Sequence, residues 1–343
     1  MRVATYYANN DLRIEEMPKP EIDKGELLIK VMASGICGTD VVEWYRRDRV
    51  PLVLGHEIAG AVVEVGKGVK EYKVGDRVSA SHHVPCLECH YCLMDHHSVC
   101  DTLRKTKFYP GGFSEFLVVP EINVEKGGVY KLPDEVSFEE ATFIEPLACA
   151  IRGQRLAGHK PGQTVLIIGS GISGLLHIQL AKTKSFKKII ATDINDYRLE
   201  KAFNFGANCA IHAREDVAGK IKEVNEGRLA DLVILCASSK AAFQQAFKSV
   251  GKGGTVLVFA SAEEGYEYPL PINEFFWRNE ATITSSYAAN PKEHLDALEL
   301  IQDRKVNVKD MITHRFSLDN IQNSFDLVAK AKESIKVIIE PQR

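Results

Sequence analysis

Four cysteines lie close together in a short polar segment of the chain. They are Cys86, Cys89, Cys92 and Cys100. Four thiolates at this spacing match the tetrahedral site that Zn²⁺ favours, which leaves no open position for a substrate. We therefore expect a structural zinc that holds together a lobe, residues 84–102, too short to bury a core of its own. An iron–sulfur cluster or free thiols are the alternatives, and three histidines of the same segment could compete as ligands.

A second group of residues has the pattern of a dinucleotide-binding turn. It consists of Gly169, Gly171, Ile172, Ser173 and Gly174. The group follows an apolar strand, residues 164–169, and opens a predicted helix, residues 171–184, which is the context that binding of a pyrophosphate requires. Asp193 ends the next predicted strand, where a carboxylate meets the ribose hydroxyls of NAD and repels a 2′-phosphate. The pattern predicts NAD rather than NADP.

Two further features of this region are predicted to contact the cofactor. The guanidinium of Arg198 could stack on the adenine, and the alternative is an exposed arginine on a helix surface. Phe259, Ala260 and Ser261 follow another predicted strand. Because ligands of parallel sheets bind at the carboxyl ends of the strands, we expect these three residues to flank the nicotinamide.

A third group lies nearer the amino terminus, where Cys37 is followed at a distance by Gly55-His56-Glu57. A lone cysteine and a lone histidine usually reflect packing. Beside the other two groups, Cys37 and His56 become candidate ligands of a catalytic zinc, which needs a few protein ligands and one open position.

These groups require two kinds of element to position them. Up to about residue 145 the chain has short apolar runs with glycine punctuation, at residues 27–31, 58–66, 77–80 and 116–120, which predict a β-rich domain. From residue 163 strands alternate with helices, with strands at residues 164–169, 188–193, 232–236 and 255–259. This alternation predicts an α/β domain with a doubly wound parallel sheet. Helices at 291–303 and 318–331 and a strand at 335–339 follow.

Composition limits the possible functions. With 343 residues, 45% of them hydrophobic and 26% charged, the chain is predicted to be a folded two-domain protein. A net charge of −3 provides no basic field for nucleic acid or a membrane surface, so we expect small-molecule partners. No secretory leader or membrane span is predicted, and the clustered cysteines favour a cytoplasmic protein. Cys149, Cys209 and Cys236 are predicted to be buried core residues.

Several motifs, taken in their order along the chain, resemble the zinc-dependent medium-chain dehydrogenase/reductase (alcohol dehydrogenase) family. The resemblance covers essentially the whole chain. Besides the three groups above, they include Gly112-Phe-Ser-Glu115 and Ile144-Glu145-Pro146. Residues 143–147 are similar to sorbitol and other polyol dehydrogenases, whereas residues 192–200 and 312–319 are closer to threonine dehydrogenase.

The resemblance implies a GroES-like catalytic domain, residues 1–145 and 290–343, and a Rossmann NAD-binding domain, residues 146–289. It implies two zinc ions per chain, one of them catalytic. Cys37 and His56 match the ligands of that catalytic zinc. Glu57 matches the carboxylate that can approach this metal, Glu145 a residue that ligates it directly or through water, and Thr39 the hydroxyl that passes the substrate proton outward.

The chain also departs from the family pattern. Val42 stands where many relatives have a histidine that relays the proton. His83 falls where threonine dehydrogenases have an active-site histidine, with His82 beside it. Ser286-Tyr287 replaces an Arg-Tyr pair of polyol dehydrogenases near the cofactor, which removes one donor.

The expected reaction is oxidation of a secondary alcohol of a polyol, sugar alcohol or cyclitol-type substrate, with hydride transfer to NAD. One alternative is an L-threonine dehydrogenase, and another is an NAD-responsive binding protein with a degenerate site. Arg46, Arg47 and Arg49 could meet an acidic or phosphorylated substrate, or belong to a solvated loop. The resemblance also implies a homo-oligomer, a dimer or tetramer.

Overall fold

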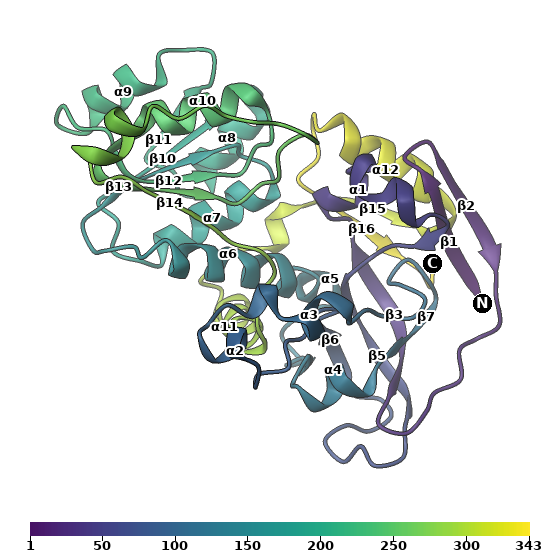
Figure 1. Cartoon of the computed structure of the whole chain (residues 1–343). Coiled ribbons are helices and arrows are strands. Elements are labelled where there is room, and N and C mark those ends of the chain that lie inside the picture. Colours follow the sequence, from purple (N-terminus) through teal and green to yellow (C-terminus); the bar gives the residue numbers. More distant parts are fainter. The chain divides into compact units, whose positions relative to one another are not determined.

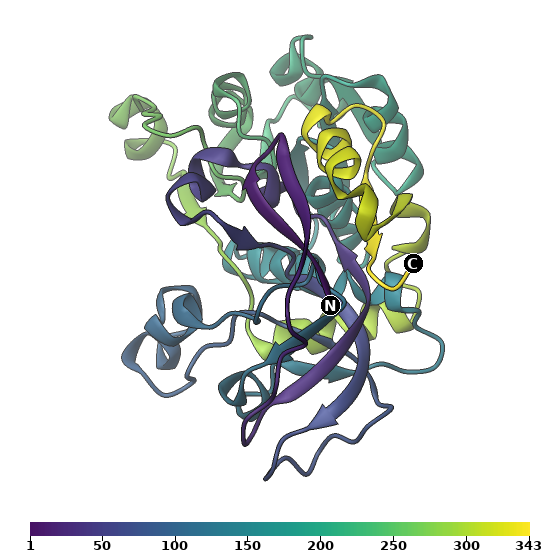
Figure 2. The same cartoon turned by 90° about the vertical axis from the view of Figure 1, so that its right-hand side faces the viewer.

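The structure is a computed structural model that describes all residues, Met1–Arg343. The chain divides into two compact units. The first, here the β-rich unit, comprises Met1–Ala148, Ala288–Arg304 and Val308–Arg343, and the second, the α/β unit, comprises Cys149–Tyr287 and Lys305–Asn307. Both are visible in Figures 1 and 2. No helix combines the length and apolar character that a bilayer crossing requires.

The β-rich unit is built on two sheets. The smaller has the order β2-β1-β4, and the larger has the order β15-β16-β3-β5-β6-β8, with β7 also paired to β3. The strands are β1 (Arg2–Ala8), β2 (Asp11–Glu16), β3 (Leu27–Gly35), β4 (Leu52–Val53), β5 (Glu57–Val65), β6 (Arg77–Ala80), β7 (Phe116–Val119), β8 (Val129–Lys131), β15 (Ile312–Ser317) and β16 (Lys336–Glu340). The central strand β3 is almost wholly buried, as its apolar sequence predicts.

Short helices connect these strands. They are α1 (Glu43–Arg46), α2 (His90–Leu93), α3 (Asp101–Lys105), α4 (Glu121–Glu125), α5 (Phe138–Ala141), α11 (Pro291–Gln302) and α12 (Ile321–Lys330), with 3₁₀ turns at Gly38–Val41, Arg47–Arg49, His97–Val99, Lys309–Met311 and Leu318–Asn320. The helix α6 (Ile144–Leu156) runs from this unit into the next. The predicted helix 318–331 is therefore a 3₁₀ turn followed by α12.

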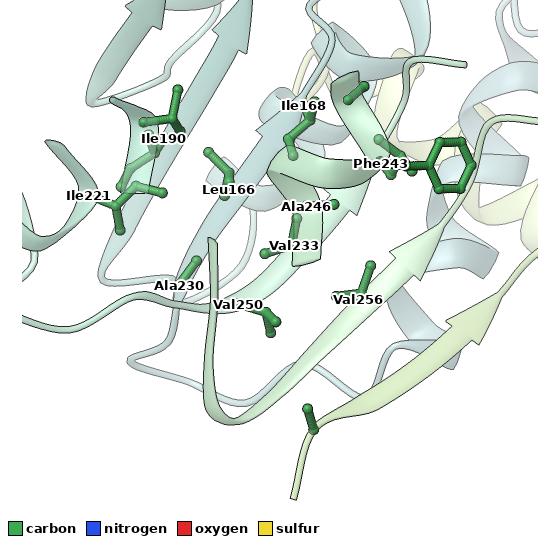
Figure 3. Close-up of a cluster of buried hydrophobic side chains, with 14 of the residues drawn as sticks. Leu166, Ile168, Ile190, Ile221, Ala230, Val233, Phe243, Ala246, Val250 and Val256 are labelled. Atoms are coloured by element: carbon green, nitrogen blue, oxygen red, sulfur yellow. The ribbon is translucent and has the colours of Figure 1, made fainter. Parts of the chain in front are cut away.

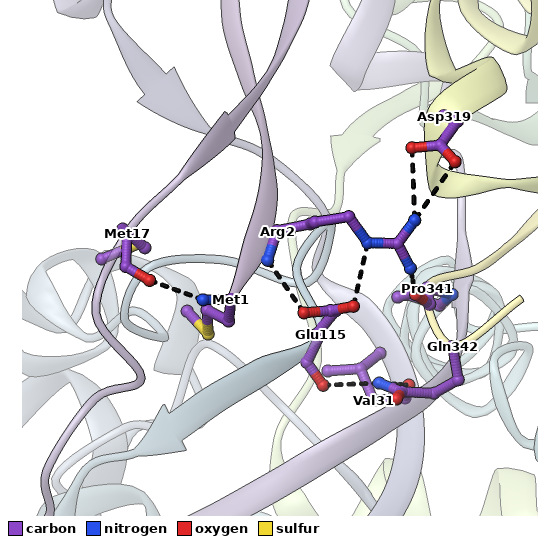
Figure 4. Close-up of polar contacts among 8 residues, drawn as sticks. All are labelled: Met1, Arg2, Met17, Val31, Glu115, Asp319, Pro341 and Gln342. Atoms are coloured by element: carbon purple, nitrogen blue, oxygen red, sulfur yellow. Dashed lines mark hydrogen bonds and ion pairs between the residues drawn. The ribbon is translucent and has the colours of Figure 1, made fainter.

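Polar contacts join the two ends of the chain within the β-rich unit (Figure 4). The Arg2 side chain pairs with Glu115 at 2.9 Å and with Asp319 at 3.1 Å. It also donates to the carbonyl of Pro341 at 3.1 Å, and Gln342 donates to the carbonyl of Glu115 at 2.8 Å. These contacts tie the carboxy-terminal segment to β1 and to the residue before β7.

The α/β unit contains one six-stranded parallel sheet in the order β11-β10-β9-β12-β13-β14. The order reverses between β9 and β12, which is where doubly wound sheets bind their ligands. Helices lie on both faces (Figure 1). The elements are β9 (Thr164–Ile168), α7 (Ile172–Lys182), β10 (Lys188–Asp193), α8 (Asp196–Asn204), β11 (Cys209–His212), α9 (Val217–Val224), β12 (Ala230–Leu235), α10 (Lys240–Ser249), β13 (Val250–Val258), a π-helical turn (Asn273–Trp277) and β14 (Thr282–Ser285).

The core of the α/β unit explains why the sequences of its strands are continuous apolar runs. Every residue of β9 is buried, because helices cover both faces of a parallel sheet. Figure 3 shows part of this core, in which Leu166, Ile190 and Val233 belong to adjacent strands and Phe243 reaches it from α10. The predicted fold class, a β-rich unit with a doubly wound parallel-sheet unit, is confirmed.

The prediction that three cysteines are buried core residues is wrong. Cys149, Cys209 and Cys236 are only half-buried. Cys209 begins β11, the edge strand of the sheet, and Cys236 follows the end of β12, so each lies where the cover of the sheet ends.

Candidate active site and metal centres

Three candidate metal ligands meet at one end of the central pair of strands in the β-rich unit. Cys37 follows β3 and caps a 3₁₀ turn, and His56 immediately precedes β5. The pairing of β3 with β5 sets Gly35 opposite Glu57. As a result one ligand atom each of Cys37, His56 and Glu57 lies within 4.8 Å of the other two. A thiolate, an imidazole and a carboxylate in this arrangement suit Zn²⁺.

A buried carboxylate, Asp40, lies next to two of these residues, Cys37 and His56. It accepts a hydrogen bond from the backbone N–H of Cys37 at 3.0 Å, and its other oxygen lies 3.6 Å from His56 Nδ1. Burial by itself lowers the pKa of His56, but the Asp40 carboxylate raises that pKa well above its ordinary value. A carboxylate on Nδ1 is the usual device that fixes the ring of a metal-binding histidine through its other nitrogen.

Glu57 meets a buried cation from the carboxy-terminal strand. Lys336, on β16, is fully buried and forms an ion pair with the Glu57 carboxylate. The pairing of β16 with β3, in which Ile338 lies opposite Gly35, brings this lysine to the cluster. A buried charge is costly without a partner, and in this ion pair each of the two side chains supplies the partner of the other.

Thr39 lies beside the sulfur of the cluster. Its hydroxyl donates to Cys37 Sγ at 3.3 Å. The hydroxyl is therefore placed to contact a ligand that binds next to that sulfur. Arg46 donates to the Thr39 carbonyl at 3.3 Å and lies 3.6 Å from Asp40. Of the three arginines of this segment, Arg46 thus packs against the site, whereas Arg47 and Arg49 are exposed.

A row of imidazole rings extends from the cluster. The ring centroids of His56 and His82 are 4.7 Å apart, and those of His82 and His83 are 3.7 Å apart. His83 Nδ1 faces the carbonyl of Thr106 at 3.0 Å. Burial lowers the pKa of His83 to about 4 and that of His82 well below its usual range, so both rings are neutral at neutral pH. His82 rather than His83 is the ring that contacts His56.

Glu145 is not brought into the group of three ligand atoms. It lies in the first turn of α6, and the group within 4.8 Å comprises Cys37, His56 and Glu57 alone. Its role as a ligand therefore stays a prediction.

The four-cysteine lobe brings its sulfurs together as its spacing predicts. The ligand atoms of Cys86, Cys89, Cys92 and Cys100 all lie within 4.8 Å of one another. Backbone N–H groups of Cys86 and Cys89 donate to the sulfurs of Cys100 and Cys86 at 3.4 and 3.3 Å. Burial opposes ionisation of Cys100, but the N–H groups of Cys86 and Leu103 and hydrogen bonds with the Cys86 and Cys92 side chains lower the pKa of Cys100 to about 6. The four donors fit a closed zinc site.

The glycine-rich turn joins β9 to α7 as expected. At Gly174 an added Cβ would lie 1.9 Å from the Gly169 carbonyl oxygen, so only glycine allows the helix to pack this close to the turn. Gly171 caps α7 without any side-chain hydrogen bond, which leaves the first N–H groups of the helix available to an anion. Ile172 and Ser173 form the first turn of α7.

Asp193 lies at the end of β10 beside this turn. Its carboxylate accepts from the backbone N–H groups of Ser170 at 2.8 Å and Asn195 at 3.0 Å. Each oxygen keeps a further lone pair that could accept a ribose hydroxyl. Arg198 is half-buried and approaches the turn, since an added Cβ at Gly171 would lie 3.6 Å from its guanidinium. It is therefore not an exposed surface arginine.

The remaining predicted cofactor residues follow β13 and β14. Phe259 and Ala260 are half-buried and Ser261 is exposed. Ser286 has a buried hydroxyl oxygen without a hydrogen-bond partner, and the Tyr287 side chain is exposed. All five residues lie at carboxyl ends of strands of the α/β unit.

Two residues of the site have no role in the sequence analysis, Asp40 and Lys336. Asp40 had a local signal, because its carboxylate closes a capping box on the Cys37 backbone three residues earlier. Lys336 had a weaker one, a buried charge at the start of the strand β16, which is apolar at its next three positions. Only the strand pairing shows that its partner is Glu57.

Two family models match the chain. Residues 23–134 match the alcohol dehydrogenase GroES-like domain, and residues 173–303 match the zinc-binding dehydrogenase domain. The first match includes Cys37, His56 and the cysteine lobe, and the second begins within the glycine-rich turn.

Individual proteins are similar over nearly the full length. Sorbitol dehydrogenase of Bacillus subtilis is 33% identical, with 100% of this chain and 98% of the relative covered. L-threonine 3-dehydrogenase of Escherichia fergusonii is 30% identical, with 97% of each covered. An alcohol dehydrogenase of Escherichia coli CFT073, solved in complex with NADH, superposes with a TM-score of 0.87 at 28% identity and covers 99% of both chains.

Proposed function

Because the chain belongs to the zinc-dependent medium-chain dehydrogenase family and is an alcohol or polyol dehydrogenase that uses zinc and NAD, we propose that it oxidises a secondary alcohol of a polyol, sugar alcohol or cyclitol-type substrate to a ketone. The observation that carries the proposal is the cluster of Cys37, His56 and Glu57 beside the Thr39 hydroxyl. An enzyme of this family needs no separate explanation as an NAD-responsive binding protein, so that alternative is not retained.

The donor sets fit the two metals. Cys37 and His56 would hold the catalytic zinc with Glu57 within reach, and the four cysteines of the lobe would hold the structural zinc. A zinc ion in the first site supplies Lewis acidity, which lowers the pKa of an alcohol hydroxyl. NAD supplies the hydride acceptor, and Gly169, Gly171 and Asp193 would hold its pyrophosphate and ribose.

Side chains of the protein itself would transfer the proton and position the ligands. Thr39 would accept the proton of the substrate hydroxyl and release it outward, since its hydroxyl oxygen can accept and donate at once. Val42 offers no imidazole to continue that path, so we expect the next acceptor to be water. Asp40 would orient the His56 ring from its Nδ1 side, and Lys336 pairs with Glu57 within the core.

L-threonine is the second candidate substrate. The relative from Escherichia fergusonii acts on it by name, and His82 lies in ring contact with His56, close to where the substrate would bind. A neutral imidazole there could accept a hydrogen bond from an ammonium group. On the analogy of the family, we expect a cytoplasmic homo-oligomer for either substrate.

The experiment is a substrate panel on zinc-loaded protein with NAD, with formation of NADH measured by absorbance. The panel contains sugar alcohols, inositols, aldonates, sugar phosphates and L-threonine. We expect turnover of a polyol, loss of turnover in Cys37→Ala, and one zinc fewer per chain in that variant. Cys209→Ala, which changes a half-buried cysteine outside both groups, should keep activity and both metals. Turnover of L-threonine alone would favour the second candidate, and an active Cys37→Ala with two zinc ions would contradict the site.

A further inference from the structure

The Phe259 ring is packed between two helices of the α/β unit. On α7, His177 is fully buried, and its ring stands at 89° to that of Phe259 with the centroids 4.6 Å apart. On α6, an added Cβ at Gly153 would lie 3.2 Å from the Phe259 ring, so the ring packs closely against the helix backbone there. The backbone N–H groups of Phe259 and Ala260 both donate to the carbonyl of Leu235, at 3.1 and 2.9 Å. The start of this segment is thus held through its backbone and through one ring.

Gln154, also on α6, sets the orientation of the His177 ring. Its Nε2 donates to the His177 carbonyl at 2.9 Å and lies 3.2 Å from His177 Nδ1. An amide nitrogen can only donate, so Nδ1 is the acceptor and the ring hydrogen lies on Nε2. Burial lowers the pKa of His177 to about 3, and the ring therefore stays neutral in the working pH range.

This arrangement is more polar than packing alone requires. His177 Nε2 and Gln154 Oε1 are both buried without a hydrogen-bond partner in the chain. A buried donor or acceptor left unpaired costs stability that an apolar side chain of similar shape would not. The His177 ring, however, packs edge to face against the Phe259 ring. This geometry is favourable for an aromatic pair and fixes the orientation of the two rings relative to each other.

We propose that His177, oriented by Gln154, is a positioning residue for Phe259–Ser261, the segment that flanks the nicotinamide. The inference rests on the proposed function and on the expectation that this segment, at the carboxyl end of β13, flanks the nicotinamide. His177 contacts neither substrate nor cofactor. It acts through the Phe259 ring, and a loosened ring leaves the segment free to shift away from the bound nicotinamide.

The test compares two ligands that share the adenine half of NAD. NADH contains the nicotinamide and ADP-ribose does not, so only NADH binding should depend on the Phe259–Ser261 segment. In His177→Ala we expect NADH to bind about tenfold more weakly, the scale of one lost aromatic pair. ADP-ribose binding should stay unchanged. His177→Phe restores a ring and should recover most of the NADH affinity.

The chain offers a control near the amino-terminal ends of strands of the same sheet. His159 precedes β9 and contacts the Phe186 ring, which precedes β10, with centroids 4.5 Å apart, and its Nε2 is also unpartnered. His159→Ala removes a similar ring pair near the amino ends of the strands and should change neither affinity.

Three results would overturn the inference. These are an unchanged NADH affinity in His177→Ala, an equal loss for NADH and ADP-ribose, and a His177→Phe variant no better than the alanine variant. Failure of the parent protein to bind NADH at all is a different outcome. It would overturn the proposed function, and the inference with it.

Discussion

Two buried carboxylates near Cys37 have different cationic partners, and the difference assigns them different tasks. Asp40 lies 3.6 Å from both His56 and Arg46, and its other oxygen accepts the Cys37 N–H. This carboxylate is therefore placed to orient a ligand ring. Glu57 forms its ion pair with Lys336 instead, a buried cation from the carboxy-terminal strand β16.

Asp193 is the residue on which the choice of cofactor should depend. Its carboxylate is fixed by two backbone N–H groups, and a 2′-phosphate placed against it would meet like charge. In Asp193→Ala we expect the KM for NAD to rise about tenfold or more, the scale of one or two lost charge-assisted hydrogen bonds. The preference for NAD over NADP should shrink with it.

The measurement is kcat/KM with each cofactor at saturating alcohol. Asp196→Ala, an exposed aspartate in the first turn of α8, is the control and should leave both values near those of the parent. A cofactor ratio that does not change in Asp193→Ala would contradict the predicted contact with the ribose.

At the scale of elements, the short helix α5 shows how a local pattern and a distant partner act together. Ser137 and Glu140 form a reciprocal capping box, with hydrogen bonds of 2.9 and 3.1 Å, and Glu140 also pairs with Arg304. Burial raises the pKa of Glu140, but the Ser137 N–H and Arg304 outweigh it and the net pKa is lowered. A carboxyl whose pKa is lower when folded stabilises the fold above its unfolded pKa and loses this effect in acid.

We therefore expect Glu140→Gln to lower the free energy of unfolding by about 1 kcal/mol at neutral pH, which is the usual cost of losing a helix cap. As pH falls below the ordinary glutamate pKa of about 4, the difference from the parent should narrow, because the parent's carboxyl becomes protonated too. Denaturant unfolding at several pH values measures this. Glu125→Gln, an exposed glutamate in α4, should show no difference at any pH, and a constant gap for Glu140→Gln would refute the assignment.

How far the sequence predicts each element depends on whether its signal is local. The run 164–169 and the predicted helix 171–184 correspond to β9 and α7 within two residues, because both patterns lie within one stretch of chain. The candidate ligands Cys37, His56 and Glu57 needed the family pattern as well, since a lone cysteine and histidine are ambiguous. Lys336 was missed for a physical reason: its contact with Glu57 arises from strands β16 and β3, whose pairing no local pattern shows.

At the scale of the whole molecule, the two candidate metal groups have unequal structural surroundings. Cys37 and His56 lie next to the central strands β3 and β5 of a large sheet, and Glu57 lies on β5; this sheet has an extensive apolar core of its own. The core cluster of the cysteine lobe is small and has Cys92, Cys100 and the adjoining Leu103 as its buried residues. So small a core offsets little of the entropy of ordering the backbone, and we therefore expect a bound metal to supply much of the stability of the lobe.

Cys92→Ser should therefore lower the thermal stability of the protein without lowering its turnover. We expect the variant to bind one zinc instead of two and to melt at least about 4 °C lower, because loss of a structural ligand unfolds the lobe. Its kcat, measured well below the melting temperature, should stay near that of the parent, since Cys37 and His56 are unchanged. Zinc content, thermal unfolding and turnover are measured on one preparation, with Cys209→Ser as the control for loss of a thiol outside both groups. A variant that keeps both zinc ions, or one that melts with the parent, would show that the four sulfurs do not hold a structural metal.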